Sequence, residues 1–409
     1  MRNMYQTFSQ SIKTLLLLRH GRALQTAFYN LMKVISVMLD CNKVLDTYPH
    51  TLSLAQRKLA LSLVDPENRA LRYCFGRNAL SLALSDLIRA DAYIDDFAPP
   101  GSTWYGKPVL TLEQVGRDDI IVNCVINAKP RTAFARLQAA GFSQLVSYAS
   151  LCKAMPETIP LPDFVRETRA DVTLHAQQWR AVFDRLADDE SRQVFNDVLH
   201  YRLTGDHTVL ANYSFRPQEQ YFEDFMDFER EVFVDAGGFD GDTTEQFCRR
   251  YPDYRQVYLF EPSPQNIALA RQRLAGFEHI EFIEKGVSDS EGTLYFNANE
   301  GSSSAVTLEG DSAIHVTTID ACIASEVSFI KMDLEGWEIN ALKGAAQHIA
   351  RERPKLAIAV YHRPSDMWGI FNLVDSYAPG YRIYLRHYTE SWTETVMFFL
   401  PDSTGQAVG

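Results

Sequence analysis

Cysteine is scarce in this chain, and none of it stands in a metal-binding pattern. The 409 residues contain six cysteines, scattered from Cys41 to Cys322, with no Cys-x-x-Cys pair and no matching histidine spacing. This distribution excludes a zinc module of ordinary spacing and a disulfide framework. It fits a reducing compartment, so we expect a cytoplasmic protein.

Long apolar runs are also missing. No stretch approaches the roughly 18 apolar residues of a membrane span. The apolar run at 14–18 is short and is not followed by a small-residue cleavage site. We therefore expect neither a transmembrane segment nor a signal peptide.

Acidic residues are absent from positions 1–39, although the whole chain has a net charge of −12. The negative total argues against a nucleic acid partner. The basic start allows two interpretations: a helical cap with a solvated basic face, or a peripheral contact with an anionic membrane surface. We favour the cap, because the apolar positions form no clean stripe with aromatic anchors.

The length requires more than one core, and the pattern changes along the chain indicate four parts. Short apolar runs alternate with helical spacing in the second part, which predicts a small parallel sheet. Its first turn has one glycine, Gly76, where a dinucleotide loop needs three, so this part is either a scaffold or a site for another ligand. The four parts are a helical segment at 1–65, a small Rossmann-like domain at 66–150, a helical bridge at 151–230 and a larger α/β domain at 231–409.

The fourth part opens with an apolar run that ends in an acid and a glycine-rich turn, at 232–244. This pattern predicts a buried strand, a tight loop and a helix start. Further acids follow later predicted strands, and in an open α/β sheet ligands bind at the carboxyl ends of the strands. The candidate residues are Asp235, Gly237, Gly238, Gly241, Asp242, Glu261, Ser288, Asp289 and Asp333.

The charge of the loop bears on the cofactor. Asp240 and Asp242 would repel a pyrophosphate, whereas a sulfonium and an amino group would be attracted. Glu261, at the end of the second strand, could accept hydrogen bonds from both ribose hydroxyls. These residues favour S-adenosylmethionine over a dinucleotide, and a sheet without catalytic activity is the third alternative.

Four segments together resemble the FkbM family of class I methyltransferases: 233–243, 259–262, 286–289 and 331–336. The resemblance covers about 220–400 and implies a class I methyltransferase-type Rossmann-like sheet, preceded by the smaller α/β domain and the helical segments. It implies S-adenosylmethionine-dependent O-methylation of a sugar, a glycoconjugate or a related hydroxylated metabolite. In the loop, Gly238 and Phe239-Asp240 replace the alanine and asparagine that are usual in the family.

The resemblance also implies which residues would contact each part of S-adenosylmethionine. Asp235 and the loop glycines would hold the methionine part, Glu261 the ribose, and Ser288 with Asp289 the adenine. Each has a plain structural alternative, since glycines shape turns and Asp289 could cap its own turn. Tyr221, before the first strand, would close over the donor or simply pack in the core.

A sugar hydroxyl needs a base to take its proton during transfer. The candidates are Asp333 and Glu335 after the fourth strand and His362 after the fifth, with His362 or Asp333 preferred. We assign no metal. As an alternative, Asp333, Glu335 and Glu338 could hold a divalent ion that orients a diol, although the helix dipole explains Glu338 equally well.

Three functions follow from these features. The first is methyl transfer to a sugar-containing acceptor. The second is a donor-binding scaffold without turnover in glycan assembly, which the long preceding half suggests. The third is a dehydrogenase that uses one of the two sheets. The sequence predicts neither the acceptor nor an oligomeric state.

Overall fold

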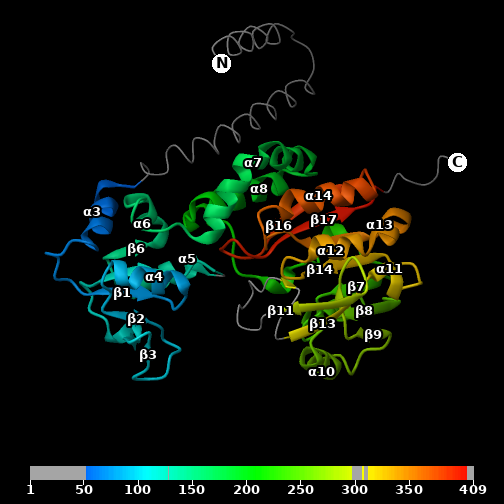
Figure 1. Ribbon diagram of the computed structural model, residues 1–409, viewed down its shortest axis with the longest axis horizontal. Coiled ribbons are helices and arrows are strands. Elements are labelled where there is room, and N and C mark those ends of the chain that lie inside the picture. The colour runs from blue at the N-terminus through cyan, green and yellow to red at the C-terminus, as the bar shows by residue number, and fades with distance from the viewer. Residues whose placement is uncertain (1–51, 128, 297–305, 308–311, 403–409) are drawn as a thin grey trace, which may run out of the picture. The chain divides into compact units, whose positions relative to one another are not determined.

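The computed structural model describes residues 52–127, 129–296, 306–307 and 312–402 (Figure 1). Residues 48–409 form one compact unit. The basic segment at 1–39, its membrane contact and most of the predicted helical segment at 1–65 lie outside the described residues. Within the described ranges, no helix is both long and apolar enough to cross a membrane.

The first sheet has six strands in the order β3-β4-β2-β1-β5-β6. Four of them are parallel to their neighbours: β1 (Arg72–Phe75), β2 (Ala92–Ile94), β5 (Ile120–Asn123) and β6 (Leu145–Ser147). At one edge, β4 (Lys107–Leu110) pairs in parallel with β2 and antiparallel with β3 (Thr103–Trp104). The four parallel strands lie where alternating apolar runs predicted them.

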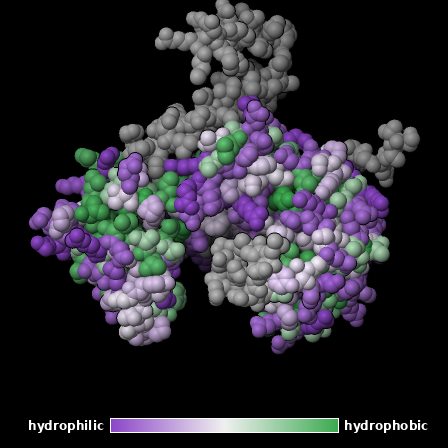
Figure 2. All heavy atoms as spheres, viewed as in Figure 1, coloured by the Kyte–Doolittle hydropathy of each residue, from purple (hydrophilic) through white to green (hydrophobic). Residues whose placement is uncertain are grey.

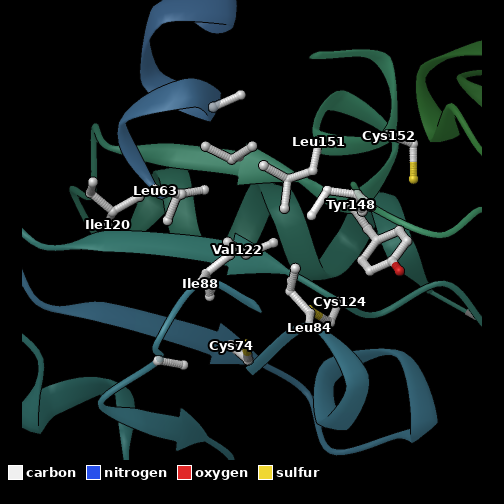
Figure 3. Close-up of a cluster of buried hydrophobic side chains, with 14 of the residues drawn as sticks. Leu63, Cys74, Leu84, Ile88, Ile120, Val122, Cys124, Tyr148, Leu151 and Cys152 are labelled. Carbon is white, nitrogen blue, oxygen red and sulfur yellow. The ribbon is translucent and has the colours of Figure 1, made fainter. Parts of the chain in front are cut away.

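The core of this sheet is built with the helices α3 (Leu54–Ser62), α4 (Ala79–Leu87) and α6 (Tyr148–Ala154); α5 (Pro130–Ala139) packs on β5 and β6. In Figure 3, apolar side chains from α3, α4, α6 and the strands point toward one another. Cys74, Cys124 and Cys152 are buried in this core and are not joined by a disulfide. These cysteines therefore act as small apolar residues rather than as ligands.

A pair of helices follows, α7 (Asp163–Arg185) and α8 (Asp189–Thr204), which pack on each other. Gly205 ends α8 with a left-handed φ of 68°, as its position in the sequence predicts. Three short 3₁₀ turns, η3 (His207–Leu210), η4 (Pro217–Glu219) and η5 (Asp224–Met226), then lead into the second sheet. The segment with η4 and η5 brings Tyr221 to the site described below.

The second sheet has seven strands in the order β16-β17-β15-β14-β7-β8-β9. The strands β7 (Val232–Ala236), β8 (Gln256–Phe260), β9 (Ile280–Ile283), β14 (Phe329–Met332) and β15 (Lys355–Ala359) are parallel, while β16 (Arg382–His387) and β17 (Thr395–Leu400) form an antiparallel hairpin at one edge. Because β7 pairs with both β8 and β14, the order reverses beside it. That reversal places a crevice at the carboxyl end of β7.

The helices of this part are α9 (Asp242–Arg250), α10 (Pro264–Arg273), α11 (Ile319–Cys322), α12 (Glu338–Lys343), α13 (Ala346–Glu352) and α14 (Asp366–Tyr377). The apolar spacing at positions 339, 342, 346 and 349 predicts one helix, and the structure has two. They separate at Ala345, whose backbone, with φ −115° and ψ 10°, is not helical. Gly344, just before it, packs against the backbone of Ser288, since a Cβ atom there would lie 2.0 Å from the Ser288 carbonyl oxygen.

A small sheet lies after β9, and the sequence pattern predicts only one of its strands, at 293–296. Its order is β10-β13-β11-β12, formed by β10 (Gly286–Val287), β13 (Ser312–Thr317), β11 (Gly292–Phe296) and β12 (Val306–Thr307). Its strands are short and mostly antiparallel. Side chains from β10, β11 and β13 reach the site.

Polar residues cover most of the face in Figure 2, while apolar residues gather over the part that holds the first sheet. Exposed large apolar side chains of that part include Leu54, Leu71, Leu87, Phe97 and Tyr105.

Candidate functional site

A cavity of about 820 Å³ lies at the carboxyl ends of β7, β8, β14 and β15. Residues from all four strand ends, the η4–η5 segment and the small sheet line it. Of the residues predicted from the sequence, six line the cavity: Tyr221, Gly237, Asp242, Glu261, Asp333 and Glu335. Asp235, Gly238, Gly241, Ser288, Asp289 and His362 lie outside this lining.

The glycine loop after β7 is shaped by close packing. Gly237 has a φ of +81°, and a Cβ atom there would lie 2.1 Å from the carbonyl oxygen of Asp333. A Cβ on Gly238 would overlap the side chain of Leu259, and Gly241, with φ +83°, approaches the backbone of Ala270. Only glycine fits such a conformation at such distances. Gly237 therefore forms the cavity wall, whereas Gly238 and Gly241 serve the packing beneath it.

Behind the loop lies a buried ion pair. Asp235, fully buried, accepts a hydrogen bond from the Thr244 hydroxyl at 2.7 Å, and its other oxygen is 3.0 Å from Nζ of Lys331. Lys331 also donates to the Gly237 carbonyl at 2.8 Å. Burial opposes the charge of Lys331, but Asp235 and Asp333 outweigh that effect and raise its pKa. Asp235 thus holds Lys331 against the loop and does not itself face the cavity.

Lys331 was not among the predicted site residues, although it begins the motif at 331–336. Its side chain lines the cavity and lies 5.3 Å from the centre of the Tyr221 ring. The available signal was the lysine itself, because a charged side chain within a fully buried strand needs a partner of opposite charge or a ligand.

Glu261 lies at the end of β8 and is held by neighbouring donors. One oxygen accepts from the backbone N–H of Ser263 at 2.9 Å and from Nδ2 of Asn266 at 3.2 Å; the other accepts from the N–H of Phe239 at 3.1 Å. Burial raises its pKa, and these three hydrogen bonds oppose that rise. A carboxylate accepts about four hydrogen bonds. Glu261 therefore keeps room for one ribose hydroxyl without losing a partner, rather than for the two that we expected.

The side of the cavity beyond Glu261 is apolar. It is lined by Pro262, Val287, Leu294, Ile314, Val316 and Trp337. Such a slot suits a flat heterocycle. Ser288 accepts a hydrogen bond from Nε1 of Trp337 at 3.1 Å, and Asp289 accepts from Nδ2 of Asn340 at 3.3 Å. Both residues thus position the wall of the slot, and the small sheet supplies much of its surface.

The opposite side is acidic. Oδ2 of Asp333 accepts a hydrogen bond from the Tyr221 hydroxyl at 2.7 Å, and the Tyr361 hydroxyl lies 3.3 Å from Oδ1. Gln220 donates to the Tyr221 hydroxyl at 2.8 Å and to Glu394 at 2.9 Å. Gln220, Tyr361 and Glu394 were not predicted from the sequence, and all three line the cavity.

Burial raises the pKa of Glu394 to about 7, and the charge of Asp333 adds to the rise. The carboxyl of Glu394 is therefore partly protonated near neutral pH. It adds negative charge to the cavity as the pH increases.

His362 lies behind this acidic side. Its Nδ1 is 3.1 Å from Oε1 of Glu338, and its Nε2 is 3.5 Å from both Oδ1 of Asp333 and Oε2 of Glu335. Burial lowers the pKa of His362, but the contact with Glu338 and the charges of Asp333 and Glu335 raise it to about 9. Glu338 is fully buried, whereas the side chain of Glu335 is 69% exposed. The structure therefore gathers Asp333, Glu338 and His362 more tightly than the trio of acids that we considered as metal ligands.

The arrangement combines an apolar slot, a carboxylate at the middle and a ring of acids at the far side. An aromatic heterocycle joined to a cationic group would match all three parts, because the heterocycle is apolar and the acids favour positive charge. A pyrophosphate would be repelled by the carboxylates of Asp242 and Glu261, and Asp235 already balances the positive charge of Lys331.

Three comparisons with known proteins bear on this site. Residues 235–391 match the model of the methyltransferase FkbM domain. The crystal structure of methyltransferase FkbM from Methylobacillus flagellatus aligns with 89% of this chain and 98% of its own, with a TM-score of 0.68 and 22% identity. At this identity the likeness shows the fold alone, and it confirms the predicted class I methyltransferase-type architecture with its preceding α/β part. Comparison with curated proteins gave no match.

Two other solved structures align over smaller parts. An rRNA methylase from Streptococcus thermophilus covers 49% of this chain and 96% of its own, with 17% identity and a TM-score of 0.29. Fibrillarin from Aeropyrum pernix, solved with natively bound S-adenosylmethionine, covers 42% of this chain and 67% of its own, with 13% identity and a TM-score of 0.29. These scores are too low to inform the activity of this chain.

Proposed function

We propose that this chain, whose residues 235–391 match the methyltransferase FkbM domain, methylates a hydroxyl group of a sugar, a glycoconjugate or a related hydroxylated metabolite. The observation that carries this proposal is the cavity with an apolar slot at one end and Asp333 at the other. S-adenosylmethionine, the proposed donor, would supply the methyl group from its sulfonium.

The donor would be held along the cavity. Trp337 and the small sheet would cover the adenine, and Glu261 would accept from a ribose hydroxyl. Gly237 and Asp242 would face the methionine part, with the acids stabilising its positive charges. Lys331 lines the same region; two of its three N–H groups meet Asp235 and the Gly237 carbonyl, which leaves one that would donate to the methionine carboxylate. Tyr221 lines this region from the η4–η5 segment and donates to Asp333, so it would pack beside the donor.

Asp333 is the proposed base. It lines the cavity and is fixed by the hydroxyl groups of Tyr221 and Tyr361, so its carboxylate can meet an acceptor hydroxyl in one orientation. Fixed orientation matters because methyl transfer is an in-line displacement. His362 lies behind Asp333 and outside the cavity lining, so its position supports a role in orienting the acids rather than direct contact with the acceptor.

An oxygen acceptor is supported by the polar side of the cavity. Gln220, Tyr361, Arg363 and Glu394 surround Asp333 with hydrogen-bonding groups. A polyhydroxylated acceptor would find donors and acceptors there, whereas an apolar acceptor would leave them unpaired.

The test is donor-dependent methylation of a panel of sugar nucleotides, lipid-linked glycans and free hydroxylated metabolites, followed by mass spectrometry. The expected product is about 14 Da heavier than the acceptor, because methylation adds one CH₂. Asp333→Asn should reduce the rate of methylation at least about tenfold. Donor binding without methylation of any acceptor would instead support the scaffold function. If the protein leaves the fluorescence of NADH unchanged, the dehydrogenase function is rejected.

A further inference from the structure

The strongest unexplained feature is the group of charged side chains behind the cavity. One ligand atom each from Asp333, Glu338 and His362 lies within 4.8 Å of the others. These residues come from the turn after β14, the start of α12 and the loop after β15, so only the fold brings them together. Among the described residues, this is the trio whose spacing would suit a metal ion.

Two of the three side chains are buried and incompletely paired. The side chain of His362 is only 9% exposed, and neither ring nitrogen has an aligned hydrogen-bond partner among the described residues. Glu338 is fully buried; its Oε1 accepts from the backbone N–H of Leu334 at 2.7 Å, while its Oε2 has no partner in the described part. Buried polar atoms of this kind are rare unless a ligand or an ion meets them.

The distances are close to those of a coordination shell. Ligands of an ion with bonds of about 2.1 Å lie roughly 3–4 Å apart. A histidine binds an ion through one ring nitrogen, so the set takes one atom from each of Asp333, Glu338 and His362, and these three atoms lie within 4.8 Å of one another. Small side-chain rotations would therefore close the set around one ion.

We propose that Asp333, Glu338 and His362 bind a divalent cation of the Mn²⁺ type. Two carboxylates and one imidazole form a mixed oxygen and nitrogen set, which suits Mn²⁺ better than a soft, thiolate-seeking ion. Asp333 lines the cavity, so the ion would face the acceptor side through it. There it would hold an acceptor hydroxyl and increase its acidity. This use of the ion rests on the proposed function, whereas the binding of the ion does not.

Glu335 offers a matched control. Its Oε2 lies as near to His362 as Oδ1 of Asp333 does, 3.5 Å, but its side chain is largely exposed and it is not one of the trio. If general negative charge attracted Mn²⁺, Glu335→Gln would weaken binding as much as Glu338→Gln. A defined site requires that Glu338→Gln and His362→Gln have much the larger effects.

The experiment is a titration of the full-length protein with Mn²⁺, followed by electron paramagnetic resonance. We expect one Mn²⁺ per chain, at least about tenfold weaker binding in Glu338→Gln and His362→Gln, and less than about threefold weaker binding in Glu335→Gln. S-adenosylmethionine affinity, measured by calorimetry on the same samples, shows that each variant is folded. Asp333→Asn provides a third ligand variant if one of the others does not fold.

Failure to bind Mn²⁺ at millimolar concentration, or equal binding by all variants, overturns the metal site. The proposed function is tested separately by the methylation panel, with and without a chelator. Methylation that a chelator leaves unchanged, with no bound Mn²⁺, would support the methyltransferase and reject the ion. Stoichiometric Mn²⁺ binding without methylation of any acceptor would support the ion and reject the proposed acceptor class.

Discussion

The hydroxyl of Tyr221 donates to Oδ2 of Asp333 over 2.7 Å, although the two residues stand 112 positions apart in the chain. Tyr221 has a left-handed φ of 74° and is 5% exposed. Such a backbone costs energy in a residue other than glycine, so the surrounding contacts must hold it. The segment before the second sheet thereby fixes the carboxylate that we propose as the base.

Tyr221→Phe should lower the turnover number about tenfold, since one hydrogen bond to a charged acceptor is worth about 1.5–3 kcal/mol. Donor affinity should change less than about threefold, because the aromatic ring stays in place. Tyr361→Phe is the control, since its hydroxyl lies farther from Asp333, at 3.3 Å. Steady-state kinetics and calorimetry measure the two effects; equal losses in both variants would contradict a special role for Tyr221.

Glu261→Gln should weaken S-adenosylmethionine binding about tenfold or more. The substitution removes a charge-assisted acceptor for the ribose and places an amide group against the N–H of Phe239 or Ser263. Glu281→Gln, on the exposed side of β9, is the matched control and should bind normally. An unchanged affinity of Glu261→Gln in calorimetry would remove Glu261 from the donor site.

Gly237→Ala should lower the free energy of unfolding by at least about 2 kcal/mol, because the new Cβ atom meets the Asp333 carbonyl at a positive φ. Gly276→Ala is the control, since a Cβ there has nothing within 4 Å. Urea denaturation compares the two. A mild effect of Gly237→Ala would show that the loop is less tightly packed than described.

Glu394 should make stability depend on pH. Its folded pKa of about 7 lies above the ordinary value of 4.5, so the folded state binds more protons than the unfolded state between these values. Its contribution to the free energy of unfolding is therefore present below pH 4.5 and is lost as the pH rises to 7.

Glu394→Gln removes this dependence. At pH 8 the variant should be more stable than the wild type by up to about 3 kcal/mol, and below pH 4.5 the two should be alike. Urea denaturation at several pH values measures the difference. A difference that is the same at every pH would reject the assignment.

Short segments of the sequence predicted much of the second sheet. Apolar runs ending in Asp235, Glu261 and Asp333 predicted strands β7, β8 and β14, and parallel pairing then placed those ends at one edge. These strands could be predicted because the signals are local: a buried parallel strand is a continuous apolar run, and glycines mark tight turns.

Other parts had no comparable local signal. The pattern missed α14 and, in the small sheet, the strands β10, β12 and β13, which pair across gaps in the sequence. It joined α12 and α13, since the apolar helical spacing continues past the non-helical Ala345. It grouped Asp333, Glu335 and Glu338 without showing that Glu335 is largely exposed while Glu338 is fully buried, a difference that follows the left-handed turn at Glu335 and Gly336.

The sequence by itself determined the α/β class, the order of the strand ends and the acidic character of the glycine loop, because each depends on residues that are neighbours in the chain. The tertiary structure decided which of those residues face the cavity. It turned Asp235 inward to Lys331, brought Tyr221 to Asp333 and placed His362 against Glu338. These pairs join distant segments, and only packing of the sheet and its loops sets their distances.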